Sequence, residues 1–171
     1  NFLFGGGGQD TLIGLNGNDV YIAGRETTIF DGVGGGSDIV YTSSSFALDG
    51  WAEIETISTQ NHAGTDAISI SQTLIGNYGS NALYGGGGAD TLIGLNGDDI
   101  YVVSDANTQV VDGAGGGTDL VYASVSYMLS ANAQVETLST QVHAGTYPLN
   151  LSGNGFAQAV IGNYGANVLS S

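Results

Sequence analysis

The chain contains no cysteine, a single proline and only one lysine or arginine among 171 residues. Without cysteine it can form no disulfide, no cysteine-ligated zinc site and no thiol nucleophile. One basic residue against 16 Asp and Glu gives a formal net charge of −15, which argues against nucleic acid and anionic lipid as partners. No apolar run approaches the roughly 18 residues of a membrane span, so membrane insertion is not expected.

Glycine is the residue in excess, with 30 copies in the chain, more than twice the average usage of about 7%. The glycines do not recur at every third position, and one proline is too few for collagen. Only 10% of the residues are charged while 42% are hydrophobic, whereas disordered chains combine high charge with low hydrophobicity. The composition therefore predicts a packed fold with many tight turns.

Long segments of the chain repeat. Residues 1–19 return as residues 81–99 with 15 of 19 positions identical. Two further blocks recur, residues 55–65 as 136–146 and residues 75–79 as 161–165. Such a period indicates a repeat architecture. We expect one continuous solenoid, a piece of a longer repetitive protein, with a first unit at 1–80, a second at 81–161 and the start of a third at 162–171.

A shorter period of nine residues runs inside each unit, clearest in residues 76–84, 85–93 and 94–102. Each nonapeptide has glycine at positions one and four, Asp or Asn at position six and a large apolar residue at position eight. This pattern resembles the RTX, or haemolysin-type calcium-binding, nonapeptide repeat. Six half-turns depart from it and are expected to bind calcium weakly or not at all: Leu15 and Leu95 replace the second glycine, and Asn1, Asn81, Gln72 and Gln158 replace the acid.

The nonapeptide also predicts the fold. Six turn residues followed by three strand residues make half a coil, so two nonapeptides make a coil of about 18 residues with a strand on each side. The predicted class is all-β, a parallel β-roll or β-solenoid. Position eight should point inward and form two facing stacks in a thin core, through Leu3, Leu12, Tyr21, Leu74, Leu83, Leu92 and Tyr101.

The spacing of the acids predicts two columns, because residues about 18 apart should stack on one edge of such a solenoid. One column holds Asn1, Asp19 and Asp38, repeated as Asn81, Asp99 and Asp119; the opposite column holds Asp10 with Asp31, repeated as Asp90 with Asp112. Stacked turns lie about 4.8 Å apart, so like charges there repel unless a cation lies between them. Calcium accepts six to eight oxygen ligands, whereas magnesium requires tighter geometry, and zinc or copper would need a His or Cys cluster.

The resemblance implies a specific set of calcium ligands. They are the carboxylates of Asp10, Asp19, Asp90 and Asp99 with the backbone carbonyls of Gly5, Gly7, Asn16, Gly85, Gly87 and Asn96. Asp38 and Asp119 look like the same turn, Asp31 and Asp112 are expected as partners across the coil, and Asp98 would add charge to the second unit. The alternative is an ordinary solvated turn aspartate, and it applies above all to Asp31, Asp38, Asp112 and Asp119.

Two acidic residues on one strand face, Glu53 and Glu55, have the arrangement of a glycosidase pair. The second unit carries Gln134 in place of the first of them, so the pair is not repeated and we expect no enzymatic activity. The single tryptophan, Trp51, has Asn132 as its counterpart. One exposed tryptophan is weak evidence for a ligand.

The two histidines, His62 and His143, occupy equivalent positions in the two units. A metal-binding or proton-transfer role is the alternative to a surface histidine, which we take as the default. The GGGG segments lack a following GK[ST], and a nearby aspartate would repel phosphate, so they do not form a phosphate-binding loop.

The resemblance implies a calcium-stabilised extracellular rod that belongs to a surface-layer, adhesin-stalk or filament protein. The alternative is the C-terminal secretion and folding module of an exported toxin, protease or lipase. A β-helix enzyme acting on polysaccharide is disfavoured because Arg25 is the only arginine or lysine. Export through a type I secretion apparatus, without a cleaved signal, is also implied, with folding once calcium is plentiful outside the cell. The expected partners are calcium, neighbouring repeats and, by head-to-tail contact, other copies of the chain.

Overall fold

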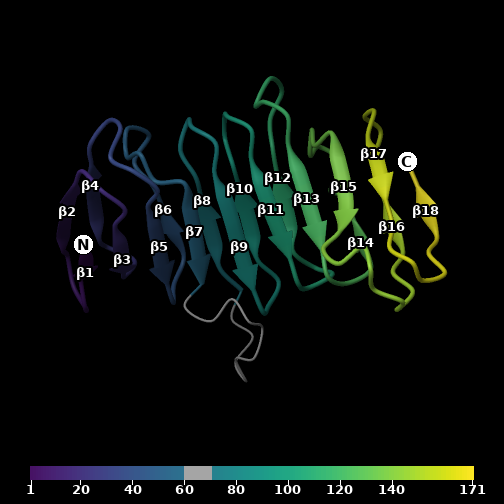
Figure 1. The fold of residues 1–171 in the computed structure, drawn as a ribbon, viewed down its shortest axis with the longest axis horizontal. Coiled ribbons are helices and arrows are strands. Elements are labelled where there is room, and N and C mark those ends of the chain that lie inside the picture. The colour runs from purple at the N-terminus through teal and green to yellow at the C-terminus, as the bar shows by residue number, and fades with distance from the viewer. Residues whose placement is uncertain (60–70) are drawn as a thin grey trace.

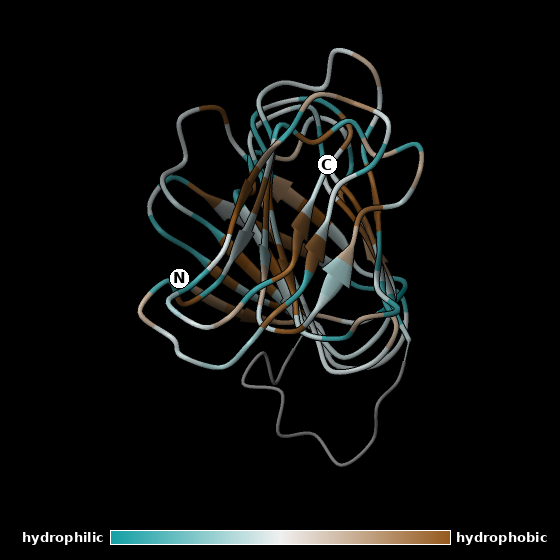
Figure 2. Ribbon diagram, turned by 90° about the vertical axis from the view of Figure 1, so that its right-hand side faces the viewer, coloured by the Kyte–Doolittle hydropathy of each residue, from teal (hydrophilic) through white to brown (hydrophobic). Residues whose placement is uncertain are grey.

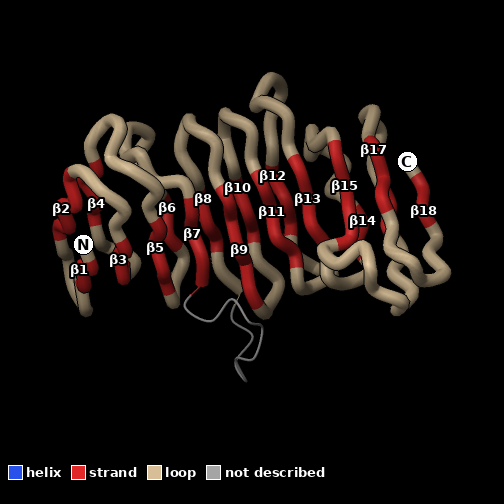
Figure 3. The backbone as a smooth tube through the Cα atoms, in the orientation of Figure 1, coloured by secondary structure: helices blue, strands red, loops and turns tan. Residues whose placement is uncertain are grey.

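The computed structural model describes residues 1–59 and 71–171, and every regular element in those ranges is a β-strand (Figure 3). Residues 1–59 and 71–171 contain no helix that could serve as a membrane span. The strands are β1 (Phe2–Phe4), β2 (Thr11–Leu15), β3 (Val20–Ala23), β4 (Thr28–Asp31), β5 (Ile39–Thr42), β6 (Phe46–Ala47), β7 (Thr56–Thr59), β8 (Thr73–Ile75), β9 (Ala82–Gly86), β10 (Thr91–Ile93), β11 (Ile100–Val103), β12 (Gln109–Val111), β13 (Leu120–Ala123), β14 (Tyr127–Met128), β15 (Thr137–Thr140), β16 (Leu151–Ser152), β17 (Ala159–Ile161) and β18 (Leu169–Ser170).

The strands wind into a parallel β-solenoid, which confirms the predicted fold class. All odd-numbered strands, β1 to β17, form one nine-stranded sheet in chain order, while the even-numbered strands form three shorter sheets. Leu3 of β1 pairs with Tyr21 of β3, so one coil takes 18 residues there. The coils stack along the long axis, with the N-terminus at one end and the C-terminus at the other (Figure 1).

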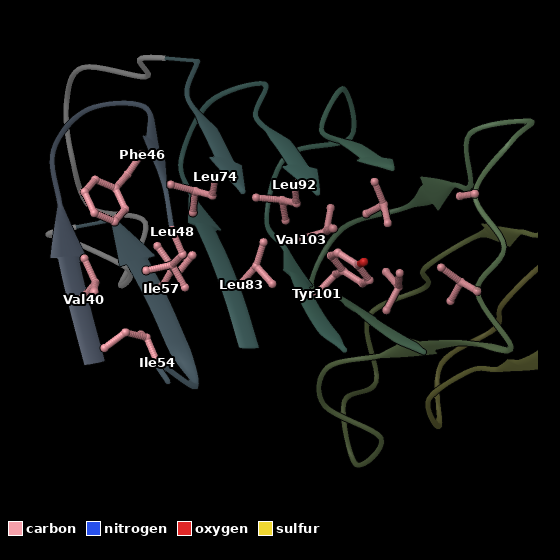
Figure 4. Close-up of a cluster of buried hydrophobic side chains, with 14 of the residues drawn as sticks. Val40, Phe46, Leu48, Ile54, Ile57, Leu74, Leu83, Leu92, Tyr101 and Val103 are labelled. Carbon is pink, nitrogen blue, oxygen red and sulfur yellow. The ribbon is translucent and has the colours of Figure 1, made fainter. Parts of the chain in front are cut away.

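The core lies between the nine-stranded sheet and the shorter sheets. Hydrophobic colour runs along the strands, while hydrophilic residues gather in the turns (Figure 2). Phe46, Leu74 and Leu92 form one row, and a facing row comes from the odd-numbered strands (Figure 4). All predicted position-eight residues reach this core: six are buried, and Leu3 packs partly buried against it. The alternation of the strand backbone explains this, because every second side chain faces inward.

The turns place glycine where a side chain would collide. A Cβ at Gly94 would overlap the Asp99 carboxylate and the Tyr101 hydroxyl. Leu15 and Leu95 replace the second glycine of their nonapeptides. They adopt φ values of 72° and 82°, in the left-handed conformation that glycine takes more readily. These leucines therefore keep the turn shape at some conformational cost.

The second copy of one repeated block lies on the opposite side of the solenoid. Residues 75–79 begin at the end of β8, in the four-stranded sheet, but residues 161–165 begin at the end of β17, in the nine-stranded sheet. By strand pairing the counterpart of β8 is β16, since β8 pairs with β6 and β16 with β14. Residues 162–171 thus lie half a coil out of phase with residues 76–85. The unit boundaries themselves remain a prediction.

Candidate metal centres

One edge of the solenoid, hereafter the acidic edge, is formed by the turns that lead from an even-numbered strand into the next odd-numbered strand. A ladder of side chains runs along it, through Asn1, Asp19, Asp38 and Glu55 and then through Asn81, Asp99, Asp119 and Glu136. The backbone N–H of Asp19 donates to Oδ1 of Asp38 (2.7 Å), and the N–H of Asp38 donates to Oε2 of Glu55 (2.7 Å). Each carboxylate is thereby fixed to the turn of the neighbouring coil.

The second unit repeats this ladder. The N–H of Asn81 donates to Asp99 Oδ1 (2.7 Å), that of Asp99 to Asp119 Oδ1 (2.8 Å) and that of Asp119 to Glu136 Oε2 (2.7 Å). The predicted column of Asn1, Asp19 and Asp38, with its repeat, therefore lies on one edge. Glu55 and Glu136 were not predicted as members of this column. They follow Asp38 and Asp119 by 17 residues, which is close to the length of one coil.

Asp31 joins Asp19 and Asp38 in a cluster, the first triad, in which one carboxylate oxygen of each lies within 4.8 Å of the others. The equivalent second triad consists of Asp99, Asp112 and Asp119.

The predicted column on the opposite edge is wrong for Asp31 and Asp112, which lie on the acidic edge instead. Asp31 is the last residue of β4 and begins the glycine-rich turn that Asp38 ends. Asp112 begins the equivalent turn directly after β12. The spacing of 21 from Asp10 to Asp31 resembles one coil only by coincidence, because Asp31 is not the sixth residue of a nonapeptide turn.

The triads are buried and incompletely hydrogen-bonded. Asp19, Asp38, Asp99 and Asp119 are at most 2% exposed, and Asp31 and Asp112 are 8% and 3% exposed. Five carboxylate oxygens of the triads are buried without a hydrogen-bond partner: Oδ2 of Asp19, Asp38, Asp99 and Asp119 and Oδ1 of Asp112. Buried unpaired charges are costly, so the oxygens require a cation or protons. Such oxygens are the donors that a hard dication prefers, and the residues therefore fit calcium.

A tyrosine from the core reaches each triad. The hydroxyl of Tyr21 donates to Oδ2 of Asp31 (2.6 Å), and that of Tyr101 donates to Oδ2 of Asp112 (2.8 Å). Burial, reinforced by the adjacent carboxylate, raises the pKa of both tyrosines, so they remain protonated donors. Sequence reasoning placed these tyrosines only in the core. The sequence does carry a signal for this contact. Position eight of the nonapeptide is leucine at Leu12 and Leu92, but it is tyrosine in the next nonapeptide, ahead of each GGG turn.

Burial also raises the pKa of three triad carboxyls, those of Asp38, Asp99 and Asp119. The pKa of Asp38 rises to about 6, and the pKa values of Asp99 and Asp119 rise to about 7, although hydrogen bonds from backbone amides oppose each increase. The protonated form is favoured because the charged form loses its hydration. Without a cation, these carboxyls would take up protons close to neutral pH.

Asp10 and Asp90 lie on the opposite edge, apart from the triads. Oδ1 of Asp90 accepts from the N–H of Gln72 (2.9 Å), and the N–H of Asp90 donates to Oγ1 of Thr108 (3.3 Å). Oδ2 of each aspartate and Oε1 of Gln72 are buried without a partner. In residues 1–59 and 71–171, neither aspartate belongs to a group of three metal-ligating side chains. Burial raises the pKa of Asp90 to about 6.

The remaining predicted ligands lie in the turns, except Gly85, which belongs to the end of β9. Asp98 is exposed, and its Oδ1 accepts from the N–H of Thr118 (2.8 Å), as Asn18 does from Ser37 (3.0 Å). It links adjacent turns and is not part of the second triad. The predicted carbonyl donors precede Asp10 and Asp90 on the opposite edge, at Gly5, Gly7, Gly85 and Gly87, and precede Asp19 and Asp99 on the acidic edge, at Asn16 and Asn96. Their role as ligands stays a prediction.

Glu53 and Glu55 both bond to backbone amides of the preceding turn. Oε2 of Glu53 accepts from the N–H of Gly34 (2.6 Å), as Glu55 does from Asp38. His143 is exposed, and its Nε2 lies 2.7 Å from Oγ of the buried Ser139. His62 lies outside the described residues.

The family model of the RTX calcium-binding nonapeptide repeat matches four copies in the chain, at residues 1–27 and 71–103. No curated protein and no solved structure matched the chain. The matched segments contain Asp19 and Asp99, whereas the other four triad residues lie outside them. The chain is thus a β-solenoid that carries RTX calcium-binding nonapeptide repeats, whose ligand is Ca²⁺.

Proposed function

We propose that this chain is a structural repeat that folds when it binds calcium and that forms part of the rod of an extracellular surface-layer, adhesin-stalk or filament protein. The principal observation in support is the pair of buried triads with unpartnered carboxylate oxygens. Units 1–80 and 81–161 would be successive segments of the rod. Its partners would be calcium and neighbouring repeats, including head-to-tail contacts with other copies.

Charge balance explains why folding would depend on calcium. Three carboxylates that converge within 4.8 Å repel one another in a site that excludes water. The thin core must also offset the conformational entropy of the ordered chain. Asp19, Asp31 and Asp38 would hold one ion, and Asp99, Asp112 and Asp119 another, with turn carbonyls completing six to eight oxygens. The bound cation supplies the positive charge that this chain, with one Lys or Arg, lacks.

A low affinity for calcium would support the extracellular setting. RTX-type sites that fill only at about 10⁻⁴ to 10⁻³ M calcium would be empty inside a cell and occupied outside it. The stacked coils give an elongated body (Figure 1), a shape suited to spacing one part of a surface protein from another.

Terbium luminescence tests the assignment of the triads. Terbium replaces calcium at oxygen sites and emits when a nearby tyrosine absorbs light, and Tyr21 and Tyr101 bond directly to triad carboxylates. We expect sensitised emission that calcium quenches by competition and that the double variant Tyr21→Phe, Tyr101→Phe strongly reduces. The variant Asp49→Asn, which removes a carboxylate outside the triads, serves as the charge control. Emission unchanged by the tyrosine substitutions would contradict binding at the triads.

A further inference from the structure

A groove opens where the ladder on the acidic edge loses its charge. After Glu55 the next residue of the ladder is the uncharged Asn81. Between the β6–β7 turn and the β8–β9 turn lies a solvent-open groove of about 400 Å³, lined by Trp51, Glu53, Glu55, Asn77 and Ser80 among others. This groove lies outside both triads.

The groove is formed by hydrogen bonds within the fold. The side-chain amide of the buried Asn77 donates to the carbonyls of Ala52 (2.5 Å) and Ile54 (3.2 Å), and Asn81 also donates to Ile54 (2.7 Å). These bonds fix the two turns against each other. A ligand would therefore enter a site whose walls are already ordered, which limits the entropy cost of binding.

The groove combines negative charge with exposed aromatic surface. Glu53 and Glu55 use only Oε2 to accept backbone N–H groups, which leaves Oε1 of each without a hydrogen bond among the described residues. Trp51 is 67% exposed, and Tyr78, equally exposed, lies against Gly50 at the rim. The chain has one Lys or Arg, and among the described residues neither glutamate forms a salt bridge.

We propose that this groove binds a guanidinium or alkylammonium group, held between the Trp51 indole and the carboxylates of Glu53 and Glu55. An indole face attracts organic cations, and a carboxylate supplies charge-assisted hydrogen bonds to the same group. Arginine or lysine side chains of a partner polypeptide and free polyamines both carry this chemistry. A metal ion would use the carboxylates but not the indole.

The second unit shows that these side chains are not required by the coil. Glu55 has Glu136 as its counterpart, and both accept the amide of the preceding ladder residue, which is a structural role. In contrast, Trp51 and Glu53 are replaced by Asn132 and Gln134, in a coil with the same strands. The substitutions Trp51→Asn and Glu53→Gln thus introduce residues that this fold already accommodates.

Trp51 is the only tryptophan, so its emission reports directly on the groove. The calcium-saturated chain would be titrated with acetyl-Gly-Arg-Gly-amide, with the same peptide carrying neutral citrulline, with agmatine and with methyl glucoside. We expect saturable changes in Trp51 emission for the arginine peptide and for agmatine, and only linear quenching for the two neutral probes. Tighter binding of the peptide would indicate a partner polypeptide as the source of the cation, and tighter binding of agmatine a free polyamine. Saturable binding of citrulline or glucoside, or no saturable change with either cation, would overturn the proposal.

Two variants locate the binding. Glu53→Gln should raise the dissociation constant of the cationic probe about fivefold or more, because one charge-assisted contact is lost. Glu26→Gln, which removes one exposed glutamate in another turn, should leave it unchanged within about twofold. Equal weakening by both would show attraction by net charge alone. Displacement of the probe by calcium above saturation would reassign the groove to a metal ion.

Discussion

The hydroxyl of Tyr101 donates a 2.8 Å hydrogen bond to Oδ2 of Asp112, and this bond connects the apolar core to the second triad. Tyr101 is fully buried, and its backbone belongs to the middle of β11. The position of one candidate calcium ligand is thus set by the core. We therefore expect core packing and calcium affinity to be coupled at this point.

Tyr101→Phe should weaken calcium binding about three- to tenfold. The substitution keeps the ring in the core but removes the donor that orients Asp112, and one such hydrogen bond contributes about 0.5–1.5 kcal/mol. Isothermal calorimetry of calcium binding would measure the change. Tyr127→Phe is the matched control, because it removes an equally buried hydroxyl that donates to the Thr108 carbonyl (2.8 Å), away from both triads. Equal losses for the two variants would argue against the orienting role.

Asp119→Asn should have opposite effects with and without calcium. The amide oxygen can still accept the Asp99 N–H, so the ladder bond survives while one buried charge is removed. The calcium-free chain should become more structured, and calcium affinity should fall about tenfold or more. Thermal unfolding, followed with calcium and with chelator, would show both signs. A variant destabilised under both conditions would contradict a purely electrostatic role.

The calcium-free chain should become more stable as the pH falls. The pKa values of Asp99 and Asp119 are about 7 and that of Asp38 about 6 in the folded state, against 3.8 ordinarily. The folded state therefore binds more protons than the unfolded state over this interval, so its stability is greatest near pH 4 and declines as the pH rises to about 7.

The far-ultraviolet β-signal in chelator between pH 5 and 8, which follows the folded fraction, would measure this dependence. The triple substitution of Asp38, Asp99 and Asp119 by asparagine should weaken this dependence and leave the part that comes from Asp90, whose pKa is also raised to about 6. With calcium present the dependence should reverse, because protons then compete with the ion for the carboxylates. A calcium-free chain that gains stability towards pH 8 would be inconsistent with the buried triads.

Gly94→Ala should strongly reduce calcium-induced folding, whereas Gly87→Ala should not. A Cβ at Gly94 would collide with Asp99 and Tyr101, but a Cβ at Gly87 meets nothing within 4 Å. Overpacking of this kind costs about 1–3 kcal/mol. The midpoint of calcium-induced folding, compared between the two variants, would reveal the difference. Similar midpoints would mean that the turn relaxes around the added methyl group.

The coil and one acidic column were predictable because both depend only on regular spacing. Nine residues per half-coil place Leu83 and Tyr101 in one stack and Asp19 and Asp38 on one edge, whichever turns connect them. Asp31 was misplaced because the turn from Asp31 to Asp38 is longer than a nonapeptide turn and carries an acid at each end. A residue in a turn of irregular length therefore cannot be placed by counting residues at a fixed period.

Other features depend on contacts that spacing does not encode. The hydrogen bond from Tyr21 to Asp31 requires the inward side of β3 to meet the end of β4. The half-coil displacement of residues 161–165 follows from the strands of the described residues, in which β8 alone lies between β7 and the first copy of the block, whereas β16 and β17 lie between β15 and the second copy. Only strand pairing, and not sequence identity, reveals which segments are equivalent.

Far-ultraviolet circular dichroism of the 171-residue chain during a calcium titration at pH 7.5, with magnesium as the control, would show whether the chain folds only when it binds calcium. We expect a cooperative transition from coil to β-structure with calcium and little change at the same concentration of magnesium. A chain that already shows its full β-signal in excess chelator would contradict calcium-coupled folding.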